Sequence, residues 1–219
     1  MFSLLVIVCA IVCTLAQVPR PCVSPPQWEG RLFDYSSDTS ERFARSGRFS
    51  YDSTYQRERL IEEIDVGNET AQYYDVIALF QARLEFVINL RSRNCSRRTI
   101  TRPWRDFGIP ENARSYGEAY VGTSARPGAG LLVTIWGGNF TTPQNETIYY
   151  TGTWTYEGCL PVHRTVYTPT SGIFHDAIYD ITTGIRDPNV FVPPRECLTD
   201  EEYKMRHKLF GESAMKKKQ

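Results

Sequence analysis

The chain has very few of the residues that catalysis and phosphate binding usually need. It has only three histidines (His163, His175 and His207), and all five of its lysines lie after residue 203. No earlier lysine is therefore present to form a Schiff base or to hold a phosphate. The sequence also contains no G-x-S-x-G elbow, H-E-x-x-H zinc motif, P-loop or G-x-G-x-x-G turn. We therefore predict that the protein is not an enzyme.

An excess of one charge and a membrane-length apolar run are also missing. The 25 basic residues balance 25 acidic ones, which argues against nucleic-acid binding. The uncharged run from Phe2 to Ala16 has about 14 apolar residues, fewer than the roughly 20 that a spanning helix needs. Small residues at Thr14 and Ala16 favour cleavage by signal peptidase. We predict a signal peptide over residues 1–16 and a secreted protein; the alternatives are an uncleaved anchor and the lysosomal lumen.

The cysteines fall into two groups. Cys9 and Cys13 lie in the leader, and the mature chain keeps four others: Cys22, Cys95, Cys159 and Cys197. An even number in an oxidising compartment predicts two disulfides, although three pairings are open. Paired cysteines supply neither a thiolate nucleophile nor zinc ligands.

Four N-glycosylation sequons agree with a secretory route. They begin at Asn68, Asn94, Asn139 and Asn145. An occupied sequon must lie on the surface, because a glycan cannot be buried. Asn94 is the least favourable of the four, because a disulfide at Cys95 would hinder the transferase. We predict a glycoprotein.

Alternating apolar and polar residues predict β structure over most of the chain. The clearest strand is Ile148–Tyr156, where Tyr150, Gly152 and Trp154 share one face. Nine further candidates are Glu29–Tyr35, Arg48–Asp52, Leu60–Val66, Tyr73–Phe80, Leu84–Leu90, Tyr116–Val121, Leu131–Trp136, Val162–Tyr167 and Ile173–Ile181. Eight to eleven short strands without intervening helices predict an all-β antiparallel meander, folded as a sandwich or a partly open barrel over residues 17–199.

The end of the chain differs in composition from this β domain. The lysines are confined to residues 200–219: Lys204, Lys208, Lys216, Lys217 and Lys218. Thr199 and Glu202 have the spacing of a capping box, which predicts a short C-terminal helix. A solvated charged tail is the alternative.

Two charged clusters are candidates for ion binding. Acidic residues at Glu62–Asp65, and Asp34 with Asp38, offer the oxygen ligands that calcium prefers, but no EF-hand loop occurs. The calcium ligands therefore stay undefined, and a solvated acidic face is the alternative. Arginines that suit an anionic glycan or lipid headgroup gather around Cys95: Arg91, Arg93, Arg97, Arg98, Arg102 and Arg105. We favour the simpler interpretation, a surface loop neutralised by nearby acids.

The residues around the cysteines resemble a known family. Its motifs occur in order over residues 20–197 as Pro21–Pro25, Trp28–Arg31, Gly47–Asp52, Arg57–Arg59, Glu62–Glu63, Tyr74–Asp75, Asn89, Cys95, Ile109–Pro110, Gly158–Pro161, Asp180–Ile185, Asp187–Phe191 and Pro193–Cys197. This pattern is similar to that of the ependymin family and its ependymin-related members. The extra cysteine pair of some vertebrate members is missing here, and the tail after Cys197 has no counterpart.

The resemblance implies several properties that the residues alone do not. Ependymins are secreted glycoproteins associated with calcium, extracellular matrix and cell adhesion. Their related members have two stacked antiparallel sheets that form a half-barrel around an apolar pocket, similar to bacterial lipoprotein carriers, and tend to dimerise. The family pairing would join Cys22 to Cys159 and Cys95 to Cys197.

The resemblance and the aromatic content together predict a hydrophobic ligand, such as a lipid, in a pocket between two sheets. The candidate lining residues are Phe86, Ile88, Val133, Ile135, Tyr150 and Trp154. The alternative function is a calcium-dependent matrix or cell-adhesion glycoprotein without a small-molecule ligand.

Overall fold

The computed structural model describes residues 19–37, 42–66, 70–142 and 145–204, and it is mainly β. The predicted leader, the sequon at Asn68, Asp38 and the end of the tail lie outside the described residues. Eleven strands are β1 (Gln27–Ser37), β2 (Arg42–Asp52), β3 (Arg57–Asp65), β4 (Gln72–Leu79), β5 (Leu84–Asn89), β6 (Cys95–Thr99), β7 (Arg114–Gly122), β8 (Gly130–Thr141), β9 (Thr147–Thr155), β10 (Pro161–Thr168) and β11 (Gly172–Thr183). Two short 3₁₀ helices follow, η1 (Pro188–Phe191) and η2 (Arg195–Cys197).

The strands pair with their neighbours in an antiparallel arrangement. Their hydrogen-bonded order is β6-β5-β4-β3-β2-β1-β11-β10-β9-β8-β7. The antiparallel β architecture predicted from the sequence is therefore confirmed. The hydrogen bonds place all eleven strands in a single strand order, rather than in the separate orders of two sheets.

Strand β6 is the one strand that the alternation pattern does not reveal. Its residues, Cys-Ser-Arg-Arg-Thr, are mostly exposed on both faces, so no apolar face marks it. It pairs with β5 on one side, and Arg97 lies opposite Phe86 with its guanidinium 5.2 Å from the ring centre. Arg97 also pairs with Glu202, and Arg102 pairs with Glu85. Part of the arginine-rich stretch thus forms an edge strand, and two arginines of the stretch have acidic partners.

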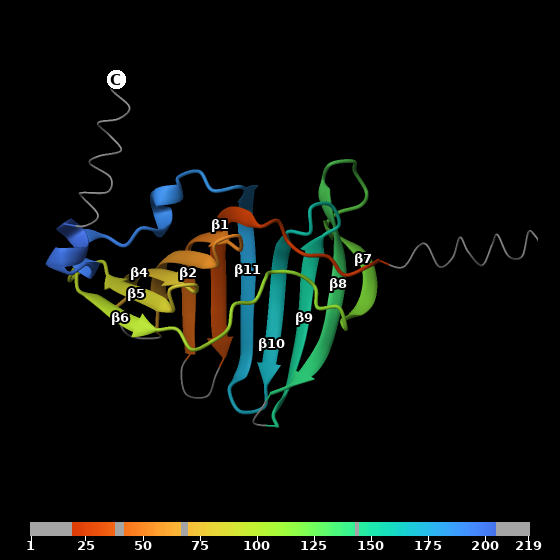
Figure 1. Cartoon of the computed structure of the whole chain (residues 1–219). Coiled ribbons are helices and arrows are strands. Elements are labelled where there is room, and N and C mark those ends of the chain that lie inside the picture. Colours follow the sequence, from red (N-terminus) through yellow and green to blue (C-terminus); the bar gives the residue numbers. More distant parts are fainter. Residues whose placement is uncertain (1–18, 38–41, 67–69, 143–144, 205–219) are drawn as a thin grey trace, which may run out of the picture. The chain divides into compact units, whose positions relative to one another are not determined.

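Unit 1, the first of two compact units, comprises the described parts of Met1–Pro25, Leu32–Ala44 and Arg105–Ile181. In it β11, β10, β9, β8 and β7 lie side by side in that order (Figure 1). Its core contains Ile109, Trp136, Trp154 and Cys159. Cys159 forms a disulfide with Cys22 across 137 positions of sequence.

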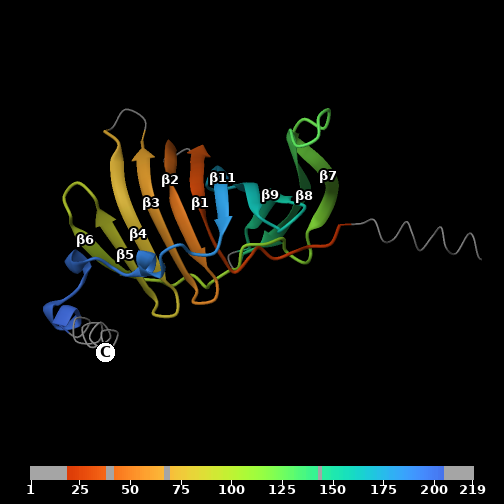
Figure 2. The same ribbon diagram turned by 90° about the horizontal axis from the view of Figure 1, so that it is seen from above.

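Unit 2 comprises Pro26–Arg31, Arg45–Trp104 and the described part of Thr182–Gln219. Strands β3, β4, β5 and β6 lie side by side in it (Figure 2). Its core contains Ile77, Phe86, Ile88 and Cys197, and Cys197 forms a disulfide with Cys95. Each unit therefore has one disulfide in its own core, and the two bridges join the cysteine pairs that the family resemblance implies.

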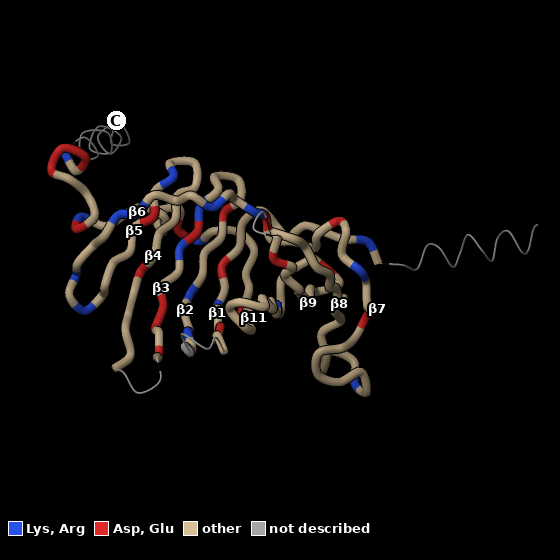
Figure 3. Tube along the Cα trace, turned by 90° about the horizontal axis from the view of Figure 1, so that it is seen from below, with Lys and Arg blue, Asp and Glu red and all other residues tan. Residues whose placement is uncertain are grey.

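Charged residues are mixed over the strands of unit 2 rather than gathered by sign (Figure 3). A largely buried pair joins Arg59 of β3 to Asp75 of β4 by two bonds, Nε–Oδ1 at 2.7 Å and Nη2–Oδ2 at 2.6 Å. The remaining nitrogen, Nη1, donates to the carbonyl of Val190 in η1 at 2.7 Å. Arg59 therefore fastens the segment after β11 to the sheet of unit 2.

The predicted C-terminal helix is present over residues 200–204, up to the end of the described chain. The backbone N–H of Glu202 donates to the Thr199 hydroxyl at 3.3 Å, and the N–H of Thr199 donates to the Glu202 carboxylate at 2.9 Å. These reciprocal bonds are the predicted capping box. Among the described residues, no helix is both long and apolar enough to cross a bilayer.

Candidate functional site

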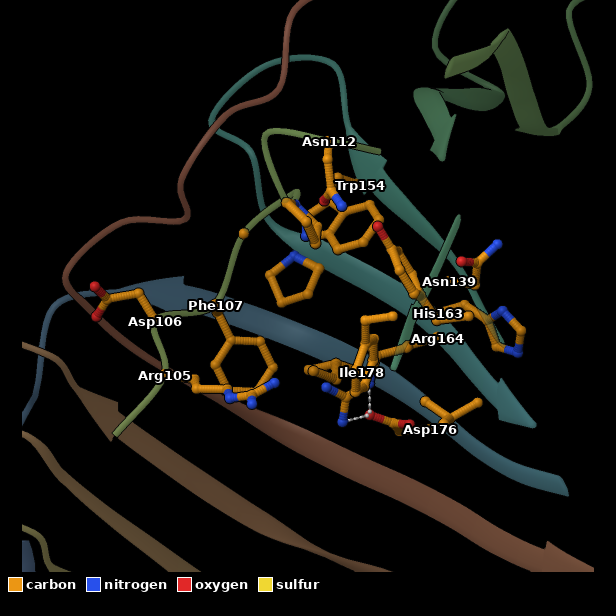
Figure 4. Close-up of a pocket in the computed structure, with 16 residues that line it drawn as sticks. Arg105, Asp106, Phe107, Asn112, Asn139, Trp154, His163, Arg164, Asp176 and Ile178 are labelled. Carbon is orange, nitrogen blue, oxygen red and sulfur yellow. Dashed lines mark hydrogen bonds and ion pairs between the residues drawn. The ribbon is translucent and has the colours of Figure 1, made fainter. Parts of the chain in front are cut away.

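Unit 1 contains a cavity of about 390 Å³, and it is the candidate binding site (Figure 4). Its lining combines aromatic and aliphatic side chains with a smaller number of polar ones. The lining residues are Arg105, Asp106, Phe107, Gly108, Pro110, Asn112, Asn139, Phe140, Tyr150, Trp154, Pro161, His163, Arg164, Val166, Asp176 and Ile178.

The floor of the cavity is one face of strands β8 to β11. Tyr150 and Trp154 are four residues apart on β9, so both point to this face with Gly152 between them. A Cβ on Gly152 would lie 2.3 Å from the Trp154 ring, and one on Gly138 of β8 would lie 3.0 Å from the Tyr150 hydroxyl. Each aromatic ring therefore lies over a glycine, Trp154 over Gly152 and Tyr150 over Gly138. Because glycine has no Cβ, the ring can occupy this space.

Replacing Gly152 by alanine is expected to destabilise the protein by about 2 kcal/mol, because the new methyl group overpacks against the indole. Thermal or urea unfolding measures this change, and the tryptophan emission of the folded variant should shift as the Trp154 ring moves. The matched control is Thr151→Val, an exposed position on the opposite face of the same strand, which should stay within about 0.5 kcal/mol of the wild type. An alanine variant as stable as this control would contradict the proposed packing.

Residues 105–112, in the connection between β6 and β7, form the roof of the cavity. The N-terminal segment holds this roof through two backbone bonds, from Ile109 N–H to the Cys22 carbonyl at 2.8 Å and from Ser24 N–H to the Phe107 carbonyl at 3.0 Å. Gly108 is required here, because a Cβ would lie 2.9 Å from the Cys22 carbonyl oxygen. The disulfide of Cys22 with Cys159 fastens that segment in turn. The roof thus depends on the first disulfide.

An ion pair between a buried carboxylate and a half-exposed guanidinium marks one end of the cavity, with the side chain of Asp176 7% exposed and that of Arg164 46% exposed. Arg164 of β10 and Asp176 of β11 lie opposite each other in the register. Both Nε and Nη2 of Arg164 contact the same carboxylate oxygen, Oδ2, at 2.9 and 2.5 Å. Burial raises the pKa of Asp176, and the guanidinium of Arg164 opposes this shift. Figure 4 shows this pair at one end of the lining and Trp154 with Asn112 at the other, with Phe107 and Ile178 between them.

His163 lies beside this pair and packs against a second histidine, His175. Burial and the neighbouring His175 lower its pKa. The two imidazoles are stacked with centres 5.8 Å apart, and His175 also stacks on Tyr35 at 4.6 Å. The Nδ1 atom of His175 is engaged with the Thr165 hydroxyl at 2.8 Å. These contacts account for both histidines as packing partners.

Of the six lining residues predicted from the sequence, two line the cavity and four do not. Tyr150 and Trp154 line the cavity. Phe86 and Ile88 lie instead in the core of unit 2, packed around the second disulfide. Val133 is buried and Ile135 half-buried on β8, and neither belongs to the lining.

Most residues of the floor and all apolar residues of the roof were not predicted from the sequence. Val166 and Ile178 lie on predicted strands, and strand alternation could have suggested them. Phe107 and Pro110 belong to a segment without periodicity. The signal available for that segment was its apolar content next to the cluster of arginines.

Three of the four sequons fall on described residues. The side chains of Asn94, Asn139 and Asn145 are all exposed, as glycosylation requires. Asn139 also lines the cavity. A glycan at this position would stand beside the binding site, whereas the other two positions do not line it.

Calcium binding stays a prediction. Glu62 pairs with Arg45 at 3.1 Å, and Glu63 accepts a hydrogen bond from the Tyr73 hydroxyl at 2.8 Å. Within residues 19–37, 42–66, 70–142 and 145–204, no group of three or more His, Cys, Asp or Glu side chains is placed to hold a metal ion. Formation of a homodimer, which the family resemblance implies, likewise stays a prediction.

Comparisons with known proteins agree with the family resemblance found in the sequence. The family model described as Ependymin matches residues 68–197. Mammalian ependymin-related protein 1 of Rattus norvegicus is 30% identical over 190 residues, covering 86% of this chain and 81% of the relative. Ependymin-2 of Carassius auratus is 29% identical over 198 residues, 89% of each chain. An uncharacterized conserved protein from Thermus thermophilus shares 5% identity and a TM-score of 0.45 over 84% of this chain and 92% of its own. The chain belongs to the ependymin family.

Proposed function

We propose that the protein is a secreted glycoprotein that carries a hydrophobic small molecule, such as a lipid, in the cavity of unit 1. The observation that supports this most directly is the partly open cavity of about 390 Å³ between the β8–β11 floor and the 105–112 roof. This volume falls in the range of small-molecule sites, which are mostly apolar with a few polar groups.

The lining supplies the driving force for such binding. Phe107 and Pro110 of the roof face Val166, Trp154 and Ile178 of the floor. Each methylene group that leaves water contributes about 0.8 kcal/mol. A chain of several carbons would therefore bind with useful affinity without a charged contact.

Extracellular location is part of the same proposal. The uncharged leader, the exposed sequons and the two disulfides are each typical of secretory proteins. Calcium-dependent adhesion without a small-molecule ligand stays the alternative prediction, and no contact among the described residues favours it over carriage.

Pyrene, a hydrocarbon without polar groups, provides the test. Fluorescence titration should show saturable binding at one site of the purified glycoprotein. Val166→Trp should weaken this binding at least tenfold, because the indole fills the space that the ligand needs. The matched control is Val121→Trp at an exposed position of the same unit, which should bind pyrene as the wild type does. Undiminished binding by a folded Val166→Trp variant would contradict the proposal.

A further inference from the structure

Three polar atoms in the cavity lining are buried without a hydrogen-bond partner in the described part of the chain. They are the Tyr150 hydroxyl oxygen, Trp154 Nε1 and Asp176 Oδ1. The side chains of Trp154 and Asp176 belong to residues that are each only 5% exposed. A buried polar atom without a partner costs about 1–3 kcal/mol, so each such atom needs an explanation. All three atoms belong to residues that line the same cavity.

The three atoms need different hydrogen-bond partners. Trp154 Nε1 can only donate, so it needs an acceptor. Burial raises the pKa of Tyr150, which keeps its hydroxyl protonated and able to donate. Asp176 Oδ1 is a carboxylate oxygen that accepts, so it needs a donor. A ligand that satisfies the lining must therefore both accept and donate hydrogen bonds.

We propose that the cavity selects an amphiphile whose head group is an uncharged hydroxyl or amide. This inference rests on the proposed carrier function and specifies its ligand class. A hydroxyl or an amide can donate to Asp176 Oδ1 at one end of the lining, and its apolar chain would lie along Phe107 and Ile178 towards Trp154 at the other end. The polar atoms orient the ligand, and the apolar wall holds it.

A fatty-acid anion fits the same lining poorly. Its carboxylate has no donor for Asp176 Oδ1 and would repel that oxygen. The lining has two arginines: Arg164 already directs Nε and Nη2 to Asp176 Oδ2, and Arg105 has its guanidinium carbon 5.8 Å from the centre of the Phe140 ring. The other charged or titratable groups that act on Asp176 are Asp34, which adds negative charge, and His163. The surroundings of the unpaired oxygen thus favour a neutral donor over an anion.

Displacement of pyrene by two ligands of equal chain length tests this selectivity. 1-Decanoylglycerol carries hydroxyl groups, and decanoate carries only a carboxylate. At pH 7.5 and below the micelle concentration of each, the monoacylglycerol should displace pyrene from the wild-type protein at a concentration at least tenfold lower than decanoate does. Equal displacement, or a preference for decanoate, would overturn the inference.

Two variants assign the selectivity to these atoms. Tyr150→Phe removes only the hydroxyl and should weaken 1-decanoylglycerol binding three- to tenfold, a larger change than it causes in pyrene binding. Asp176→Asn replaces one carboxylate oxygen by an amide donor and should reduce the tenfold preference to about threefold or less. Tyr149→Phe, an exposed neighbour on the same strand that does not line the cavity, is the matched control and should behave as the wild type.

The outcomes separate this inference from the carrier function. Pyrene binding with no difference between the two displacing ligands keeps the carrier and refutes the head-group selectivity, with water satisfying the three atoms. An unchanged ligand preference in both folded variants refutes the assignment to Tyr150 and Asp176. Failure of wild-type protein to bind pyrene at all refutes the carrier and the inference together.

Discussion

Replacing Cys22 and Cys159 by alanine together is expected to lower the free energy of unfolding and to abolish pyrene binding. The bridge closes a loop of 137 positions, which contributes about 5 kcal/mol in the chain-entropy model. The same bridge holds residue 22, whose carbonyl accepts from Ile109 in the roof. Stability and binding should therefore be lost together. Urea unfolding and pyrene titration below the transition measure the two effects.

The second disulfide is the matched control for this prediction. It closes a loop of 102 positions, which corresponds to nearly the same stabilisation of about 5 kcal/mol. It lies in the core of unit 2 with Phe86 and Ile88, and neither of these residues lines the cavity. The Cys95→Ala, Cys197→Ala variant should thus unfold more easily but bind pyrene under conditions where it is folded. Retained binding without the Cys22 bridge, or equal loss of binding in both variants, would contradict the role assigned to the roof.

Arg59→Met is expected to destabilise the protein by about 3 kcal/mol, because it leaves a buried carboxylate without its cation. Asp75 is only 5% exposed, and both of its oxygens accept from Arg59. The Val190 carbonyl loses its donor in the same variant. Urea unfolding measures the change. The double variant Arg59→Met, Asp75→Leu should recover most of the loss, because it removes the unpaired charge as well.

Arg102→Met is the control for this second prediction. Arg102 pairs with Glu85 at 3.2 Å, but its side chain is 56% exposed, so water screens the pair. Such surface pairs contribute less than about 1 kcal/mol. If Arg59→Met costs no more than Arg102→Met, the Arg59–Asp75 pair does not stabilise unit 2 as proposed.

Local patterns predicted the strands well, because each strand has its own alternation and its own turn residues. The range Ile148–Tyr156 became β9 (Thr147–Thr155), and Leu84–Leu90 became β5 (Leu84–Asn89). Strand β6 was missed because most of its side chains are exposed and none of its faces is apolar along its length. Pairing with a neighbour, rather than burial of its own residues, makes it a strand.

The candidate site could be predicted only in part. Tyr150 and Trp154 were identified from an alternating face with a central glycine, and both line the cavity. Phe86 and Ile88 also lie on an alternating apolar face, but they pack around the second disulfide in the core of unit 2. Alternation shows that a face is apolar, but it does not show whether another segment fills that face or leaves a cavity above it.

The sequence by itself determined ten of the eleven strand positions, the capping box at Thr199 and Glu202, the four mature cysteines and the family to which their flanking residues point. Each of these depends on residues close together in the chain or on a motif that can be compared directly. The tertiary structure decided that residues 105–112 form a roof over β8–β11, that Arg59 pairs with Asp75, and that three polar atoms without partners belong to the lining of one cavity. These features depend on contacts between distant segments, and the free energy of packing selects such contacts only when the whole chain folds.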